Sequence, residues 1–262
     1  RDDLIMALGI GGLLITLVVT VAIGPLPWDV GLLEEPGSIG DPALYTRDLL
    51  TALLDTLLIS IGLLTLLFAP DYLTPRKLPL AEFAATLLFA ISGGMLIAGG
   101  QDLLVLFIGL ELMVLPGYIM AVFAKRDGLS TEGAIKYFLL GSFSSAILLF
   151  GLAFVFGFTG STQVGAIAEA LSGILEGTEP LPLALAMALS MLAVGLLFKI
   201  AAVPFHYWTP DAYQGSPTPV TGYLSVGPKI AAFALILRIV VEALGPLRGE
   251  WALIIGVLAA VT

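Results

Sequence analysis

Three charged side chains lie inside long apolar runs of this sequence. The chemistry that carboxylate and amine groups can perform in such a place is the uptake and release of protons. Glu111 lies in DLLVLFIGLELMVLPGYIM, Lys199 ends LAVGLLFK, and Lys229 lies in YLSVGPKIAAFALILR. A charge at the centre of a bilayer costs about 2.5–3.5 kcal/mol on insertion scales, so such residues usually face a bundle interior and act there. Burial opposes the charged form of a lysine and a nearby carboxylate favours it. A lysine between these two influences can take up and release a proton. A static ion pair between Glu111 and Lys199 remains an alternative.

The stretch GLLFKIAAVPFHYWTPD combines a lysine with a helix breaker. Pro204 has no amide hydrogen and clashes with the carbonyl of Ile200, so the sequence predicts a helix that is broken beside Lys199. Freed backbone groups at membrane depth are tolerated only where they line protein or water, and broken helices mark ion sites in transporters. His206 titrates near neutral pH and could pass protons onward. A histidine at the membrane interface, bonded to backbone, is the alternative interpretation.

Two further charges, Lys136 and Asp55, each allow two interpretations. Glu132 and Lys136 are four residues apart with the acid first, the favourable order for a helical pair. Lys136 therefore belongs either to a surface pair or to a polar row that leads inward. Asp55, in LLTALLDTLLIS, lies only one or two turns inside its apolar run, and both a boundary role and a functional role stay open.

The elements that must hold these residues follow from composition. Of 262 residues, 58% are hydrophobic and 12% are charged, whereas soluble domains carry about 25% charged residues. A membrane span needs about 20 apolar residues, and in the hydrocarbon core runs of that length must be helices. The sequence therefore predicts an all-α, polytopic transmembrane helix bundle. Its expected spans are 4–24, 49–70, 82–100, 103–123, 131–158, 181–203 and 220–241.

Residue counts exclude several kinds of site. The chain has no cysteine and one histidine, so it can hold neither an Fe–S cluster nor a bis-histidine haem, and electron transfer would take place on a partner. The net charge of −9 argues against a nucleic-acid partner. Alternating spans place Arg1, Arg76, Lys77, Lys125 and Arg126 on one side, which the positive-inside rule makes cytoplasmic.

Glycines and chain ends complete the expectations. Glycines at 9, 11, 12, 93, 94, 99 and 100 are expected to be close-packing points between helices. The 25–48 stretch, rich in Pro, Gly and acids, is expected to be a surface loop. Arg1 stands where an initiator Met would, and the last apolar run, 251–262, is too short to span. We therefore expect the chain to be a fragment.

Four stretches together resemble one membrane-protein family. They are LFIGLELMVLPGYIM (106–120), STEGAIKYFLLGSFSSAILLFG (130–151), VGLLFKIAAVPFHYWTPDAYQGSPTPVT (194–221) and PKIAAFALILR (228–238). With these stretches the chain resembles the antiporter-like membrane subunits of proton-pumping NADH–quinone oxidoreductase (complex I), in particular the subunit N family. The motifs IKYFLLG and TPDAYQGSPTPV favour subunit N over its sister subunits.

The resemblance implies a fourteen-helix protein with two inverted five-helix repeats, each with a broken helix. By that template the chain is a single membrane domain in which 4–24 and 49–70 are peripheral spans. The first repeat then occupies 82–242, with 251–262 the start of the second. Glu111 resembles the carboxylate that tunes the central lysine, Lys199 that lysine, and Lys229 the next carrier. Lys136 and His206 match polar positions of the family's proton path.

The resemblance also implies partners and a location. The chain itself would hold no cofactor, while the other membrane and peripheral subunits of complex I would carry FMN and Fe–S clusters, with quinone as the electron acceptor. The chain would then be a non-redox, proton-translocating subunit in the lipid bilayer of the bacterial inner (plasma) membrane. An organellar membrane is the alternative location. The alternative function is a cation/proton antiporter or membrane-bound hydrogenase subunit of the same superfamily.

Overall fold

The structure, a computed structural model, describes residues 2–23, 37–39, 43–175 and 181–262. Almost all of the regular structure in these residues is helical, as predicted. The elements in chain order are α1 (Asp2–Ile23), β1 (Gly37–Ile39), β2 (Tyr45–Arg47), α2 (Leu49–Leu73), α3 (Leu80–Gly99), α4 (Leu103–Ala121), α5 (Gly128–Thr159), α6 (Val164–Leu175), α7 (Leu183–Ile200), α8 (Thr209–Gly215), α9 (Thr218–Ile236), the π-helix η1 (Leu237–Ala243), the 3-10 helix η2 (Gly245–Leu247) and α10 (Arg248–Val261).

Seven helices in the described residues are long and apolar enough to cross a membrane, and they match the seven predicted spans. Their starts follow local sequence signals. Asp48, Asp102 and Asp127 precede α2, α4 and α5, and each carboxylate accepts a hydrogen bond from a backbone amide of the first turn at 2.7–3.0 Å. Aspartate is among the best N-cap residues because it satisfies an amide that has no partner within the helix.

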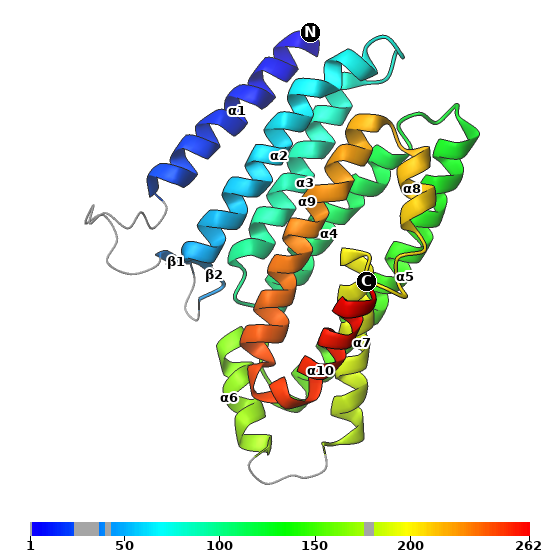
Figure 1. Ribbon diagram of the computed structural model, residues 1–262. Helices are drawn as coiled ribbons and strands as arrows, with labels where there is room; N and C mark the ends of the chain where they lie inside the picture. The colour runs from blue at the N-terminus through cyan, green and yellow to red at the C-terminus, as the bar shows by residue number, and fades with distance from the viewer. Residues whose placement is uncertain (1, 24–36, 40–42, 176–180) are drawn as a thin grey trace.

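The helices α1, α2, α3, α9 and α4 lie side by side, and α5 and α7 pack together beside them (Figure 1). The loops that carry Arg76, Lys77, Lys125 and Arg126 lie at one end of the bundle, which we call the basic end. The opposite end, where α2 begins and α3 ends, is called the outer end.

Close packing at glycine is confirmed at some of the predicted positions and wrong at others. A Cβ on Gly93 would lie 2.4 Å from the backbone nitrogen of Met113, so α3 and α4 approach each other at their backbones there. Gly99 and Gly100 are also tightly enclosed, Gly99 by Tyr45 and Gly100 by Leu106. Gly11 and Gly12 have nothing within 4 Å of an added Cβ, because their side of α1 faces away from the bundle.

The broken helix is confirmed beside Lys199. The helix α7 ends at Ile200, Ala201 adopts a left-handed conformation with φ of 59°, and turns lead to the short helix α8. The span therefore stops three residues short of the predicted end at Val203, before Pro204 is reached. As Figure 1 shows, α7 ends near mid-height of the bundle, whereas α8 lies nearer the basic end.

Sequence reasoning did not foresee the helix α6 or the hairpin of β1 and β2. The helix α6 includes Glu169 and packs against η1 at the outer end. The strands β1 and β2 form an antiparallel hairpin inside the predicted 25–48 loop, of which 25–36 and 40–42 lie outside the described residues. The final run is helical as α10 and has no buried residue.

Candidate functional site

Lys199 lies in the last turn of α7 and is buried, with 7% of its surface exposed. Its Nζ donates a hydrogen bond to Ser145 Oγ on α5 at 2.8 Å. Ser145 is itself buried, so the ammonium group and its partner are both enclosed between α5 and α7. An ammonium group at this depth needs hydrogen bonds to offset its lost hydration.

Glu111 does not form the ion pair with Lys199 that the sequence suggested: the described residues contain no carboxylate within 4.0 Å of this ammonium group. The two side chains are still near enough for their charges to interact. Among the described residues, Glu111 Oε1 is buried without a hydrogen-bond partner. Glu111 therefore lies near Lys199 without contacting it.

A narrow cavity adjoins Lys199 and reaches from α4 across to α9. It brings residues of the broken helix together with the residue that precedes Lys229 in the chain. Its lining consists of Met113, Val114, Tyr118, Tyr137, Phe198, Lys199, Trp208, Leu224 and Pro228.

Aromatic rings close the cavity towards the basic end. Trp208 stacks on Tyr137 with ring centroids 4.6 Å apart, and its Nε1 donates to the carbonyl oxygen of Phe198 at 3.2 Å. That carbonyl belongs to the last turn of α7 and also accepts the amide of Ala201 at 3.1 Å. The indole therefore adds a second hydrogen bond at the broken helix end, beside the cavity that Lys199 lines.

Lys229 lies on α9 and is half-buried. Its Nζ donates to the hydroxyl of Tyr213 on α8 at 2.8 Å, and that hydroxyl donates in turn to the carbonyl oxygen of Leu224 at 3.1 Å. Burial raises the pKa of Tyr213 to about 12, so the phenol keeps its proton at neutral pH. Tyr213 thus ties Lys229 to the segment that follows the broken helix.

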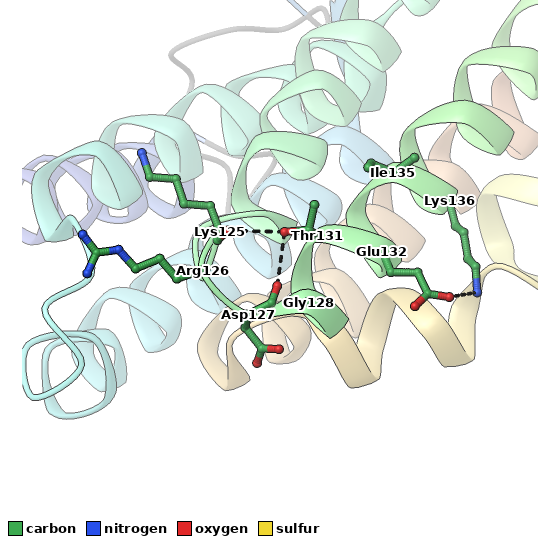
Figure 2. Close-up of a pocket in the computed structure, with 8 residues that line it drawn as sticks. All are labelled: Lys125, Arg126, Asp127, Gly128, Thr131, Glu132, Ile135 and Lys136. Carbon is green, nitrogen blue, oxygen red and sulfur yellow. Dashed lines mark hydrogen bonds and ion pairs between the residues drawn. The ribbon is translucent and has the colours of Figure 1, made fainter.

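Lys136 joins two acidic groups near the basic end. Its Nζ lies 2.7 Å from Glu132, the predicted partner, and 2.8 Å from Asp211 on α8. Figure 2 shows the Glu132–Lys136 contact at the rim of a surface hollow that also contains Lys125 and Arg126. The surface pair is present, and Asp211, whose side chain is 46% exposed, adds a second partner on α8. The polar row that leads inward from Lys136 stays a prediction.

His206 lies in the turns between α7 and α8, with its side chain exposed. Its carbonyl oxygen accepts the amide of Thr209, which begins α8. The structure therefore places His206 on the surface beside the break and apart from the buried Lys199.

Sequence reasoning missed the partners Ser145, Asp211 and Tyr213. Ser145 stands in SFSSA, a polar patch inside an apolar span, and Asp211 and Tyr213 follow Pro210 just after the break. Those signals were visible, but the helix packing decides which of them reaches a lysine.

Arg238 forms a second buried polar group at the outer end. Its guanidinium, 2% exposed, donates to Asp48 and to Glu242 at 2.7 Å each, to Thr51 Oγ1 at 3.1 Å and to the carbonyl oxygen of Ala98. Burial opposes ionisation of Asp48, but hydrogen bonds from Thr51 and Arg238 outweigh it and hold the pKa of this carboxyl below its usual value. We call Asp48, Thr51, Arg238 and Glu242 the Arg238 cluster.

Comparison with known proteins places this arrangement in a family. The family model for the transmembrane NADH:quinone oxidoreductase/Mrp antiporter proteins matches residues 100–262. NADH-quinone oxidoreductase subunit N 1 of Sorangium cellulosum is 46% identical over 192 residues, which are 73% of this chain and 38% of that protein. NAD(P)H-quinone oxidoreductase subunit 2 of Synechocystis sp. is 40% identical over 259 residues, 97% of this chain and 49% of that protein.

A solved structure agrees with these sequence relatives. A chain of respiratory complex I from Thermus thermophilus superposes with a TM-score of 0.71 at 32% identity, over 90% of this chain and 48% of that one. The chain thus spans half or less of the length of the relatives it matches.

Proposed function

The chain belongs to the transmembrane NADH:quinone oxidoreductase/Mrp antiporter family, and from that premise we propose that it is a proton-translocating membrane subunit of an NADH:quinone oxidoreductase. The observation that carries the proposal is the position of Lys199. It is a buried lysine at the end of a broken helix, and it borders a cavity that is also lined by Pro228, the residue before Lys229. A buried charge at a helix break is costly to keep and is characteristic of ion pathways.

We propose that Lys199 exchanges its proton as its contacts change. With Glu111 close to it the charged form is favoured, and when the carboxylate moves away burial favours release. Lys229, whose side chain is held in place by Tyr213, would receive the proton. Lys199 would reload from the basic end through the break, where His206, Lys136 and Asp211 are available.

The work of moving a proton against a membrane potential is similar in size to the energy of a modest change in proton affinity. Moving one elementary charge through 100 mV requires about 2.3 kcal/mol. A tenfold change in proton affinity corresponds to about 1.4 kcal/mol, so a change of about ten- to a hundredfold at Lys199 suffices to drive this movement. Side-chain rearrangement beside Glu111 can therefore drive the transfer without a large movement of helices.

In this proposal the chain is the non-redox part of the enzyme. Its partners would be the other membrane and peripheral subunits of complex I, with FMN and Fe–S clusters on the partners and quinone as acceptor. The residues from 82 to 242 would form the first five-helix repeat. The bacterial plasma membrane would be its location.

Replacing Lys199 in the full-length protein tests the proposal. In an assembled complex reconstituted into vesicles, Lys199→Ala should lower the number of protons moved per NADH oxidised. Lys125→Ala, in the surface loop, is the matched control and should leave that ratio unchanged. A normal ratio in assembled Lys199→Ala would mean that the buried lysine is only structural.

A further inference from the structure

Asp55 is a buried carboxyl that the path through Lys199 and Lys229 does not use. It lies on α2 with 1% of its surface exposed, and in the part of the chain that the structure describes its buried Oδ1 has no hydrogen-bond partner. Burying a carboxylate whose oxygen lacks a partner is costly, whereas a protonated carboxyl is much cheaper to bury. A carboxyl in this setting is suited to hold a proton.

Asp55 shares one face of α2 with the Arg238 cluster. Asp48, Thr51 and Asp55 are spaced at i, i+3 and i+7, which places them on the same side of a helix. Thr51 Oγ1 lies 2.8 Å from Asp48 Oδ1 and 3.2 Å from the carbonyl oxygen of Ala98 on α3, and its one hydrogen can be donated to either. Since a helix rises 1.5 Å per residue, Asp55 lies about 10 Å deeper than Asp48.

The hairpin supplies a proton-carrying hydroxyl beside Asp55. Burial raises the pKa of Tyr45 to about 12, and Asp55 is near enough for its charge, when it is ionised, to act on this hydroxyl. Tyr45 therefore keeps its proton at neutral pH. Among the described residues its hydroxyl makes a long contact of 3.5 Å to the carbonyl oxygen of Met95, so the hydroxyl can turn towards another acceptor.

The cluster also reaches the surface. The side chains of Asp48 and Glu242 are 33% and 37% exposed, whereas that of Arg238 between them is 2% exposed. Among the described residues, Arg47 from β2 is the charged group near enough to Asp55 to interact with it. Tyr45 lies between Asp55 and the cluster, because Asp55, Arg47, Asp48 and Arg238 are all near enough to its hydroxyl to interact with it, and Glu242 pairs with Arg238.

We propose that Asp55 is a second proton-holding site of this chain, which exchanges its proton with the outer end through Tyr45 and the Arg238 cluster. The inference rests on the proposed function, because it gives the translocating subunit a proton site on the side opposite to the break. Only a proton moves: Asp55 passes it to a water or hydroxyl oxygen that gives its own proton to the exposed carboxylates Asp48 or Glu242.

The test uses the full-length protein in the assembled complex. Asp55→Asn keeps the size of the side chain but cannot hold an exchangeable acid proton. It should lose a measurable share of the protons moved per NADH while NADH oxidation continues. Asp71→Asn, at the exposed end of the same helix, is the matched control and should pump normally. Asp55→Glu restores an acid and should restore pumping.

A chemical probe reads the same site in the unaltered protein. A hydrophobic carbodiimide adds to protonated carboxyl groups inside membranes, and mass spectrometry locates the adduct. We expect an adduct on Asp55 in the wild type, and this result decides the matter if Asp55→Asn does not assemble. Normal pumping in assembled Asp55→Asn, or an unmodified Asp55, would overturn the inference. If Lys199→Ala lowers pumping but Asp55→Asn does not, only the inference fails and the proposed function stands.

Discussion

At the scale of single residues, the site depends on which small polar group meets each lysine. Lys199 contacts Ser145, Lys229 contacts Tyr213, and Lys136 contacts Asp211 as well as Glu132. The Ser145 and Asp211 contacts join helices that are far apart in the sequence, whereas Tyr213 joins the consecutive helices α8 and α9 and Glu132 lies on the same helix as Lys136. The partners hold the ammonium groups in defined places.

Ser145→Ala tests the contact to Lys199. A hydrogen bond to a charged group contributes about 1.5–3 kcal/mol, so its loss should change the proton affinity of Lys199 and lower the protons moved per NADH. Ser144→Ala is the matched control, because Ser144 is equally buried and makes only a 3.5 Å contact to the Gly195 carbonyl oxygen. Equal pumping by the two variants would contradict a role for Ser145.

The lysines could be found from the sequence, whereas their partners could not. A lysine in an apolar run is conspicuous because charge is rare there, as at Lys199. Ser145 is one of three serines in SFSSA, and only the packing of α5 on α7 selects it. The static Glu111–Lys199 pair that the sequence left open as an alternative is absent from the described residues, since spacing along the chain does not set the distance between two helices.

At the scale of elements, the fold positions the site by one close helix contact and one helix break. Periodicity and length predicted the spans well because about 20 apolar residues have few alternatives in a membrane. The short elements were harder to predict. The helix α6 has only twelve residues, and the end of α7 is set by Ala201 and the indole of Trp208 as well as by Pro204.

Gly93→Ala tests the contact between α3 and α4. Its Cβ would meet the backbone near Met113, two residues beyond Glu111, and backbone cannot give way as a side chain can. Overpacking of this kind costs about 1–3 kcal/mol, so we expect a lower melting temperature of the complex and less pumping. Gly94→Ala would meet side chains rather than backbone, Leu58 at 3.1 Å and the Cβ of Ala231 at 3.4 Å, and should be milder. A Gly93→Ala protein as stable as Gly94→Ala would refute the close approach.

At the scale of the whole molecule, the chain divides polar groups between two ends. The basic end holds the break, Lys136 and Asp211, and the outer end holds the Arg238 cluster. Lys199, Glu111 and the cavity lie between them. This order along the bundle is what a path for protons requires, and the resemblance in sequence anticipated its centre but not its outer end.

The family description includes Mrp antiporters as well as oxidoreductase subunits, so assembly is the test at this scale. We expect the tagged full-length protein to co-purify with flavin- and Fe–S-containing subunits and to move protons without sodium. Sodium-dependent exchange, with no redox subunits in the preparation, would favour the antiporter or hydrogenase-like alternative instead.

The number of protons moved per NADH oxidised by an assembled Lys199→Arg complex tests most directly whether Lys199 carries protons. Arginine keeps the positive charge and much of the size of lysine but does not release its proton in proteins. If Lys199 carries protons, the ratio falls although the complex assembles and oxidises NADH. A ratio equal to that of the wild type would show that a fixed charge is all this position needs, and would contradict the account.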